Sequence, residues 1–184
     1  NNQALRQATG EYVLLLNPDT VLTERTFTDC LSFLDSHPDV GAVGVKMHNP
    51  YGRFALESRR GLPTPWVSFC KMCGLTALFP KSRRFGRYYM RYLPTDEPCE
   101  IEVISGAFNM IRRNALNEIG LLDERFFMYG EDIDLSYRML MAGWKNYFLP
   151  TPIIHYKGES TQKSSFRYVH SFYEAMLLFF DKHF

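Results

Sequence analysis

Hydrophobic residues in the first fifty positions follow two different periods. Residues 12–16 form a continuous apolar run, which is typical of a strand buried on both faces. Apolar residues recur at helical spacing over 27–34, and residues 40–47 have strand character again. A short helix precedes the first run, and Thr23 is placed to cap the second helix. Helices and strands therefore alternate over short connections, which predicts an α/β sheet.

The middle of the chain, residues 51–98, is less regular. Two stretches, 66–77 and 83–92, carry apolar residues at helical spacing. In the second stretch aromatic rings fall on one side and arginines on the others: Phe85, Tyr88, Tyr89 and Tyr92 against Arg83, Arg84, Arg87 and Arg91. A solvated surface helix is the simpler interpretation, and a basic aromatic face on a membrane surface is the functional one. Single-stranded nucleic acid would suit the same mixture, but no continuous basic track extends it.

The second half returns to regular patterns. Residues 101–104 and 108–111 predict extended segments separated by small residues, and a short helix then ends at Gly120. A longer helix runs from Gly130 to Gly143. Residues 144–149 and 153–156 predict two more strands, and a final helix covers about 165–184 with a broad apolar face.

Composition and charge narrow the class of protein without identifying it. The chain has 184 residues, of which 46% are hydrophobic and 22% charged, which is typical of one globular domain. The formal net charge of +1 favours neither nucleic acid nor another polyanion as partner. Cys70 and Cys73 form a CxxC pair without two further zinc ligands at matching spacing, so free thiols are expected. No apolar run is long enough to span a bilayer.

Three groups of residues are candidates for chemistry. Asn17 and Asp19 bracket Pro18 where the first strand leaves the sheet, and two oxygen ligands so spaced suit Mg²⁺ or Mn²⁺. A turn that hydrogen-bonds its own backbone is the simpler interpretation of this tetrapeptide. Glu131 and Asp132 lie in the first turn of a helix, where the dipole favours acids and a carboxylate can act as a general base. His155 ends a strand and becomes a metal ligand only if the fold brings it to Asp19.

These residues occur within motifs that resemble family 2 glycosyltransferases, in the rhamnosyltransferase-like branch. Residues 14–20 (LLLNPDT) resemble the metal-binding DxD region of that family. Four further motifs follow in the family's order: residues 105–113, 120–127, 130–138 with Gly143 and Trp144, and 155–160. The resemblance covers nearly the whole chain except about 51–98. Each motif is weak alone, and their common order carries the resemblance.

The resemblance implies a GT-A fold, a Rossmann-like α/β sandwich that binds a nucleotide-activated sugar with a divalent cation. Asp19 would bind Mg²⁺ or Mn²⁺, and His155 would be a further ligand or contact the diphosphate. Asp132 would be the base for the acceptor hydroxyl, and Glu131 would place the acceptor. Gly106 and Ala107 would line the acceptor side, and Asn17 would contact the donor's ribose or phosphate.

The expected function is an inverting, metal-dependent transfer of a sugar from a nucleoside diphosphate donor to a glycan or lipid-linked acceptor in cell-envelope polysaccharide synthesis. Base and leaving group on opposite faces imply a single inverting displacement. A catalytically inactive module that binds a sugar or a partner is the alternative. Nucleotidyl or phosphoryl transfer is a third possibility, but it requires a Gly-rich phosphate loop that the sequence does not show.

The organisation expected from the resemblance is a single, partial GT-A domain. Residues 1–50 would end the nucleotide-binding half, 51–98 would be a variable amphipathic insert, 99–163 the acceptor and catalytic half, and 164–184 a C-terminal helix. Family members begin with strands that hold the nucleotide base, so we expect an N-terminal part to be missing and the piece alone to be inactive. We expect a cytoplasmic location, peripheral on the inner face of the cell membrane through 81–92, no nucleic-acid partner, and leave the oligomeric state open.

Overall fold

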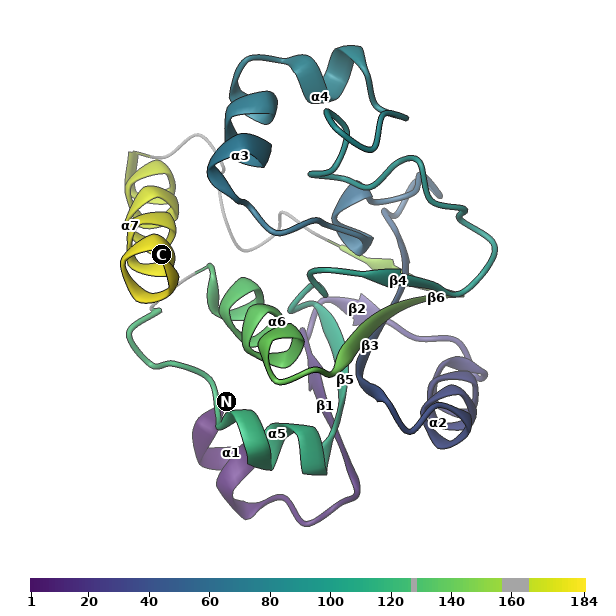
Figure 1. Ribbon diagram of the computed structural model, residues 1–184. Coiled ribbons are helices and arrows are strands. Elements are labelled where there is room, and N and C mark those ends of the chain that lie inside the picture. Colours follow the sequence, from purple (N-terminus) through teal and green to yellow (C-terminus); the bar gives the residue numbers. More distant parts are fainter. Residues whose placement is uncertain (127–128, 157–165) are drawn as a thin grey trace.

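The computed structural model of the protein describes residues 1–126, 129–156 and 166–184 (Figure 1). Within these ranges a six-stranded sheet lies between helices on its two faces. The strands are β1 (Tyr12–Leu16), β2 (Thr20–Val21), β3 (Val40–His48), β4 (Cys99–Ile101), β5 (Phe108–Arg112) and β6 (Lys145–His155). The helices are α1 (Asn2–Gln7), α2 (Thr26–Ser36), α3 (Pro65–Met72), α4 (Leu75–Leu78), α5 (Arg113–Ile119), α6 (Glu131–Met141) and α7 (Phe166–His183), with one 3-10 turn, η1 (Leu56–Ser58). The predicted α/β class is confirmed.

Strand directions gather the ends of several strands at one edge of the sheet. The strand order is β1-β5-β3-β6-β2, and β4 also pairs with β6. β3 and β6 are parallel, while β5 is antiparallel to both β1 and β3. β1, β3 and β6 therefore point the same way, so their carboxyl ends lie together with the start of β5. This is the edge at which open α/β sheets bind ligands.

Each face of the sheet buries its own apolar cluster. α5 and α6 cover one face, where Leu116, Leu135 and Met139 pack against the sheet residues Ile111 and Phe148. α2 covers the other face, and its buried positions contact a second set of sheet residues. The second cluster contains Cys30, Leu34, Val40, Val43, Val45, Met47, Phe108, Met110, Leu149 and Ile153. The two clusters hold the sheet edge in place from both sides.

The expectation that residues 12–16 are buried on both faces is wrong. β1 pairs with β5 alone, so it is an edge strand among the described residues. Val13 is buried, Tyr12, Leu14 and Leu15 are half-buried, and Leu16 is exposed. A continuous apolar run does not distinguish a central strand from an edge strand whose neighbours cover it only in part.

Two predicted strands, 144–149 and 153–156, form the single strand β6. Pro150 and Pro152 lie inside it and lack the N–H that a ladder requires. β4 pairs with β6 at residues 146–148 and β2 pairs with it at 154–155, so both prolines fall between the two partners. On the β3 side the register shifts at the same place. The prolines therefore interrupt hydrogen bonding without ending the strand.

The helix expected over 83–92 is wrong, because this segment forms turns. Gly86 lies so close to the preceding chain that a Cβ there would be 2.4 Å from the Pro80 carbonyl oxygen. Met90 has a positive φ of 46°, which a continuous helix does not permit. The aromatic and basic residues therefore project from a folded-back loop.

Two other helix predictions differ in detail. The helix expected over 66–77 is divided into α3 and α4 by Gly74, whose φ is 76°. α2 begins at Thr26, and its N-cap is Arg25 instead of Thr23. The Thr26 Oγ1 accepts a hydrogen bond from the Thr23 N–H at 3.0 Å, so the two threonines form a turn before the helix. In the described part of the chain, no helix combines the length and the apolar character needed to cross a membrane.

Candidate active site

Asp19 and His155 meet at the carboxyl ends of β1 and β6. β2 pairs antiparallel with β6 so that Thr20 lies opposite His155, and the Tyr156 N–H donates to the Asp19 carbonyl at 2.8 Å. The His155 Nε2 then lies 3.2 Å from the Asp19 Oδ1. His155 is buried, and both Asp19 Oδ1 and His155 Nδ1 are buried without a hydrogen-bond partner among the described residues. The rest of the motif 155–160, from position 157 on, lies outside the described residues, as does position 127 of the motif 120–127.

A second group surrounds Asp132 at the start of α6. The Asp132 Oδ2 accepts hydrogen bonds from the backbone N–H of Gly106, at 3.2 Å, and from the guanidinium of Arg60. Glu131 lies beside them: a Cβ placed on Gly106 would be 3.7 Å from the Glu131 Oε1 and 3.6 Å from the Asp132 Cβ. The Glu131 Oε2 is buried without a hydrogen-bond partner in the described structure. Two carboxylates and one guanidinium thus lie close together in a largely buried position.

One backbone segment, residues 105–107, connects the two groups. The Asn17 N–H donates to the Ala107 carbonyl at 3.0 Å, and Leu16 lies opposite Phe108 in the β1–β5 ladder. Gly106, which precedes Ala107, donates its backbone N–H to Asp132. Ala107 is itself buried in the core, so its backbone faces the site and its side chain does not. Asn17, Asp19, Gly106, Ala107, Glu131, Asp132 and His155 therefore lie along one end of the sheet.

The charge state of Glu131 is shifted by its surroundings. Burial raises its pKa, and the neighbouring charge of Asp132 raises it further. The charge of Arg60 lowers the pKa of Glu131. For Arg60 itself, burial lowers the pKa of the guanidinium and the charge of Asp132 raises it, and the overall shift is upward. A carboxyl group with a raised pKa next to a carboxylate held by arginine is an arrangement that separates acid and base roles.

Arg60 is the site residue that sequence reasoning missed. Its backbone carbonyl accepts from the Val103 N–H at 2.9 Å, which fixes it beside the segment leading to β5. The next residue is Gly61, and no larger residue fits there, because a Cβ would be 2.4 Å from the Arg87 carbonyl oxygen. The preceding Arg59 points into the core instead, between the rings of Phe54 and Phe148. Nothing in the pattern of two consecutive arginines indicates which one reaches the acids.

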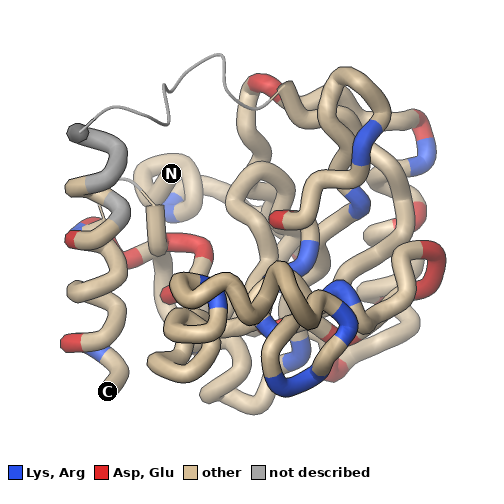
Figure 2. Tube along the Cα trace, turned by 90° about the horizontal axis from the view of Figure 1, so that it is seen from above, with Lys and Arg blue, Asp and Glu red and all other residues tan. Residues whose placement is uncertain are grey.

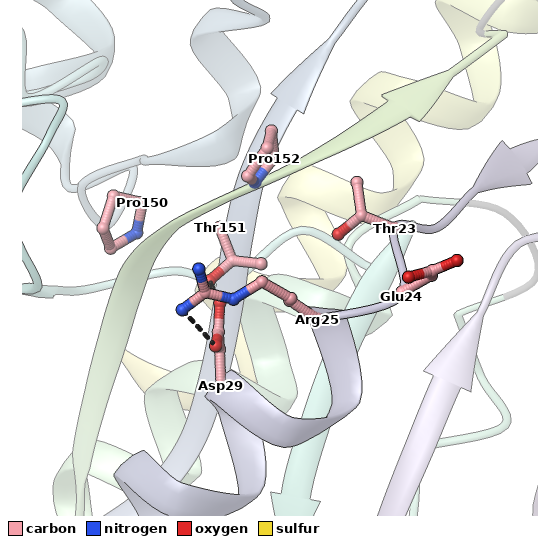
Figure 3. A pocket seen from close by; sticks show the side chains of 7 residues that line it. All are labelled: Thr23, Glu24, Arg25, Asp29, Pro150, Thr151 and Pro152. Atoms are coloured by element: carbon pink, nitrogen blue, oxygen red, sulfur yellow. Dashed lines mark hydrogen bonds and ion pairs between the residues drawn. The ribbon is translucent and has the colours of Figure 1, made fainter.

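The described residues do not complete a metal site by themselves. In residues 1–126, 129–156 and 166–184, no three His, Cys, Asp or Glu side chains gather closely enough to hold an ion. A separate hollow of about 610 Å³ lies where the start of α2 meets the Pro150–Pro152 part of β6 (Figure 3). Two of its charged residues pair, since Arg25 contacts Asp29 at 3.5 Å, and Thr151 donates to Asp29 at 2.8 Å. The hollow contains none of the candidate residues.

Comparison with known proteins relates most of the chain to sugar-transferring enzymes. The profile of "Glycosyltransferase like family 2" matches residues 1–170. An N-acetylglucosaminyl-diphospho-decaprenol L-rhamnosyltransferase of Mycobacterium tuberculosis is 28% identical over 177 residues, which cover 94% of this chain and 56% of that protein. Rhamnosyltransferase WbbL of Escherichia coli is 24% identical over 179 residues, or 89% of this chain and 63% of the relative. The chain thus spans about half to two thirds of the length of these curated relatives.

Solved structures agree on the fold. The crystal structure of GalNAc-T7 with UDP, GalNAc and Mn²⁺ superimposes with a TM-score of 0.57 at 17% sequence identity. The alignment covers 92% of this chain and 33% of that one. The similarity supports the expected GT-A arrangement of strands and helices.

Proposed function

The chain belongs to glycosyltransferase-like family 2, and we propose that its site transfers a sugar from a nucleoside diphosphate donor to a glycan or lipid-linked acceptor during cell-envelope polysaccharide synthesis. The observation that carries this proposal is the placement of Asp19 with His155, and of Glu131 with Asp132, at one end of one sheet. The shared backbone segment 105–107 contacts both groups.

Asp132 is the general base of the proposed reaction. The acceptor hydroxyl loses its proton to the Asp132 carboxylate while its oxygen bonds to the anomeric carbon of the donor sugar. The bond from that carbon to the diphosphate oxygen breaks, and its electron pair leaves with the nucleoside diphosphate. Gly106 and Arg60 orient the carboxylate, and Glu131 places the acceptor. Attack opposite the leaving group inverts the anomeric configuration.

Asp19 and His155 would hold a Mg²⁺ or Mn²⁺ ion at the donor side of the site. The Asp19 Oδ1 is buried without a hydrogen-bond partner among the described residues, and the His155 Nε2 faces it at 3.2 Å, so one oxygen and one nitrogen are placed to ligate. Such cations take one or two protein ligands and complete their shell with phosphate oxygens. A bound cation would stabilise charge on the leaving diphosphate. The presence of UDP and Mn²⁺ in the GalNAc-T7 structure supports this, and Asn17 would contact the donor's ribose or phosphate.

The proposed acceptor places the reaction at a membrane. The name of the Mycobacterium tuberculosis relative describes a decaprenol-linked acceptor, which supports a lipid-linked acceptor here. We place the protein at the cytoplasmic face, with 81–92 as a membrane contact. Arg87 of that segment is engaged with Glu102, its Nε donating at 2.9 Å, while Lys81 and Arg91 project to solvent.

Turnover of nucleotide sugars tests the proposal against the inactive alternative. With Mn²⁺ present, a wild-type protein that includes the expected N-terminal part should release nucleoside diphosphate from one member of a panel of uridine, guanosine and thymidine diphosphate sugars. Asp132→Asn should lower the rate about 10²–10⁴-fold, since it removes the base but keeps the shape. Asp181→Asn, the same change at an exposed position of α7, should leave the rate unchanged.

The opposite result identifies the alternative. Equal rates in wild type and Asp132→Asn, or no release from any donor, would favour a module that only binds a sugar or a partner.

A further inference from the structure

α3 and α4 expose a group of large apolar side chains that no described part of the chain covers. Exposed fractions range from 44% for Trp66 to 78% for Met72. We call this group the α3–α4 surface; its members are Trp66, Phe69, Met72, Leu78 and Phe79. An exposed cluster of this kind marks an interaction site more often than scattered apolar residues do.

Ring contacts make the α3–α4 surface continuous. Trp66 stacks on Phe69 with ring centroids 5.9 Å apart, and its other neighbour is Phe85 at 6.2 Å. Phe85 in turn lies 5.5 Å from Phe79. The aromatic row therefore extends from α3, across the loop that contains Phe85, to the end of α4. Val67 and Cys70, on the inner side of α3, are buried and attach the helix to the protein.

The segment that carries this surface has charge of one sign. Residues 58–95 contain no Asp or Glu and eight basic residues, namely Arg59, Arg60, Lys71, Lys81, Arg83, Arg84, Arg87 and Arg91. The whole chain has 21 basic and 20 acidic side chains, so the remainder is acidic. Figure 2, seen from the α3–α4 end, shows the Lys and Arg segments gathered near the lower centre.

Five of these basic side chains are exposed in the loop that contains Phe85. Arg87 is paired with Glu102, and the other four form what we call the basic rim: Lys81, Arg83, Arg84 and Arg91. The Arg84 guanidinium lies 5.5 Å from the Trp66 ring centroid, so charge and apolar surface are directly adjacent. Aromatic side chains flanked by Lys and Arg are the composition that binds the interface of an anionic bilayer.

We infer that the α3–α4 surface and its basic rim bind the surface of an anionic phospholipid bilayer. The inference adds an apolar area, which enters the headgroup region of the bilayer, to the proposed membrane contact of 81–92. It rests on the proposed function only in the choice of a membrane as the binding partner. Self-association through the same face is disfavoured, because an isologous contact would oppose two basic surfaces. Arg60, which holds Asp132, precedes α3 by five positions, so the segment that carries the α3–α4 surface starts at the candidate active site.

Vesicle co-sedimentation of the purified protein tests this inference. The protein should bind phosphatidylcholine vesicles that contain phosphatidylglycerol at least about tenfold more strongly than vesicles of phosphatidylcholine alone, and added salt should weaken binding. Lys81→Glu with Arg91→Glu should reduce binding to the anionic vesicles by at least about tenfold. Met72→Glu should reduce it by a similar factor, because it places a charge in the apolar area.

Matched controls isolate the surface. Arg25→Glu with Arg53→Glu reverses the same charge elsewhere, and Met141→Glu alters a methionine that is 65% exposed on α6. Both controls should bind as wild type does, and unchanged thermal midpoints should show that every variant is folded. Equal losses in variants and controls, or no preference for anionic vesicles, would overturn the inference. A co-purifying protein lost with Met72→Glu, without vesicle binding, would assign the surface to a protein partner instead.

Asp132→Asn separates this inference from the proposed function. The variant should lose turnover and keep vesicle binding, so failure of either claim is visible without the other.

Discussion

Asp132 has one carboxylate oxygen held between a backbone N–H and a guanidinium, while its neighbour Glu131 has an oxygen with no hydrogen-bond partner in the described residues. Two positive-φ residues, Tyr129 at 67° and Gly130 at 87°, precede the acids and turn the chain into α6. A non-glycine residue in this region is strained, and strain of this kind concentrates at functional sites. The acids are thus set in place by a costly local backbone conformation.

Glu131→Gln should raise stability at neutral pH. Because burial and Asp132 raise the pKa of Glu131, the native state keeps its proton to higher pH than the unfolded chain does. The stability that Glu131 contributes is therefore complete below the ordinary pKa of 4.5 and is lost as pH rises through the folded pKa. Gln lacks this loss, so urea unfolding should show an advantage for the variant that grows from pH 4.5 to 8.

The same variant separates the roles of the two acids. Turnover should fall by about tenfold or less, the worth of one hydrogen bond, against the larger loss for Asp132→Asn. An unfolding advantage that does not change with pH, or a greater loss of turnover than in Asp132→Asn, would contradict these assignments.

At the scale of elements, α7 is attached to α6 through a buried carboxylate. Asp134 is completely buried and contacts Arg138 at 2.9 Å, Lys182 at 2.7 Å and His183 at 2.7 Å. Burial alone would raise the pKa of Asp134, but hydrogen bonds from Lys182 and His183 and the charge of Arg138 lower it overall. Apolar contacts of Phe179 and Ala175 with Ile133 add to this attachment.

Asp134→Asn should destabilise the protein by about 3–5 kcal/mol, because three basic groups would lose their shared buried partner. Chemical unfolding at pH 7 measures this. Asp181→Asn, at an exposed position of α7, should change the free energy of unfolding by less than about 0.5 kcal/mol. The difference between wild type and Asp134→Asn should shrink as pH falls below 3.8, since the lowered pKa stabilises the fold only above that range. Similar values for both variants would show that α7 is held by its apolar contacts alone.

The spacing of apolar residues and glycines in the sequence predicted the bounds of α5 and α6. α5 ends at Gly120 and α6 lies between Gly130 and Gly143, because glycines with positive φ bound both helices, as the sequence indicates. The turns of 83–92 could not be predicted from periodicity, because the decisive contact joins Gly86 to Pro80. Nor could the continuity of β6 past its prolines, which depends on where β2 and β4 end.

At the scale of the whole molecule, the candidate site also depends on contacts between residues that are distant in the sequence. The adjacency of Asp19 and His155 followed from a family resemblance, since the two are separated by most of the chain. Arg60 had no such signal, because its position depends on the backbone bridge to Val103 and on the close passage of Gly61 over residue 87. The insert over 51–98 thus contributes to the acids at 131–132 and to an exposed apolar and basic surface.

The central claim is that Asp19, His155 and Asp132 surround one ligand. The most direct measurement is Mn²⁺-induced line broadening in the NMR spectrum of the protein with a nucleoside diphosphate present. We expect broadening of both the His155 ring and the Gly106 amide, and its loss from both in Asp19→Asn. Broadening at only one of the two, or broadening that persists in Asp19→Asn, would contradict it.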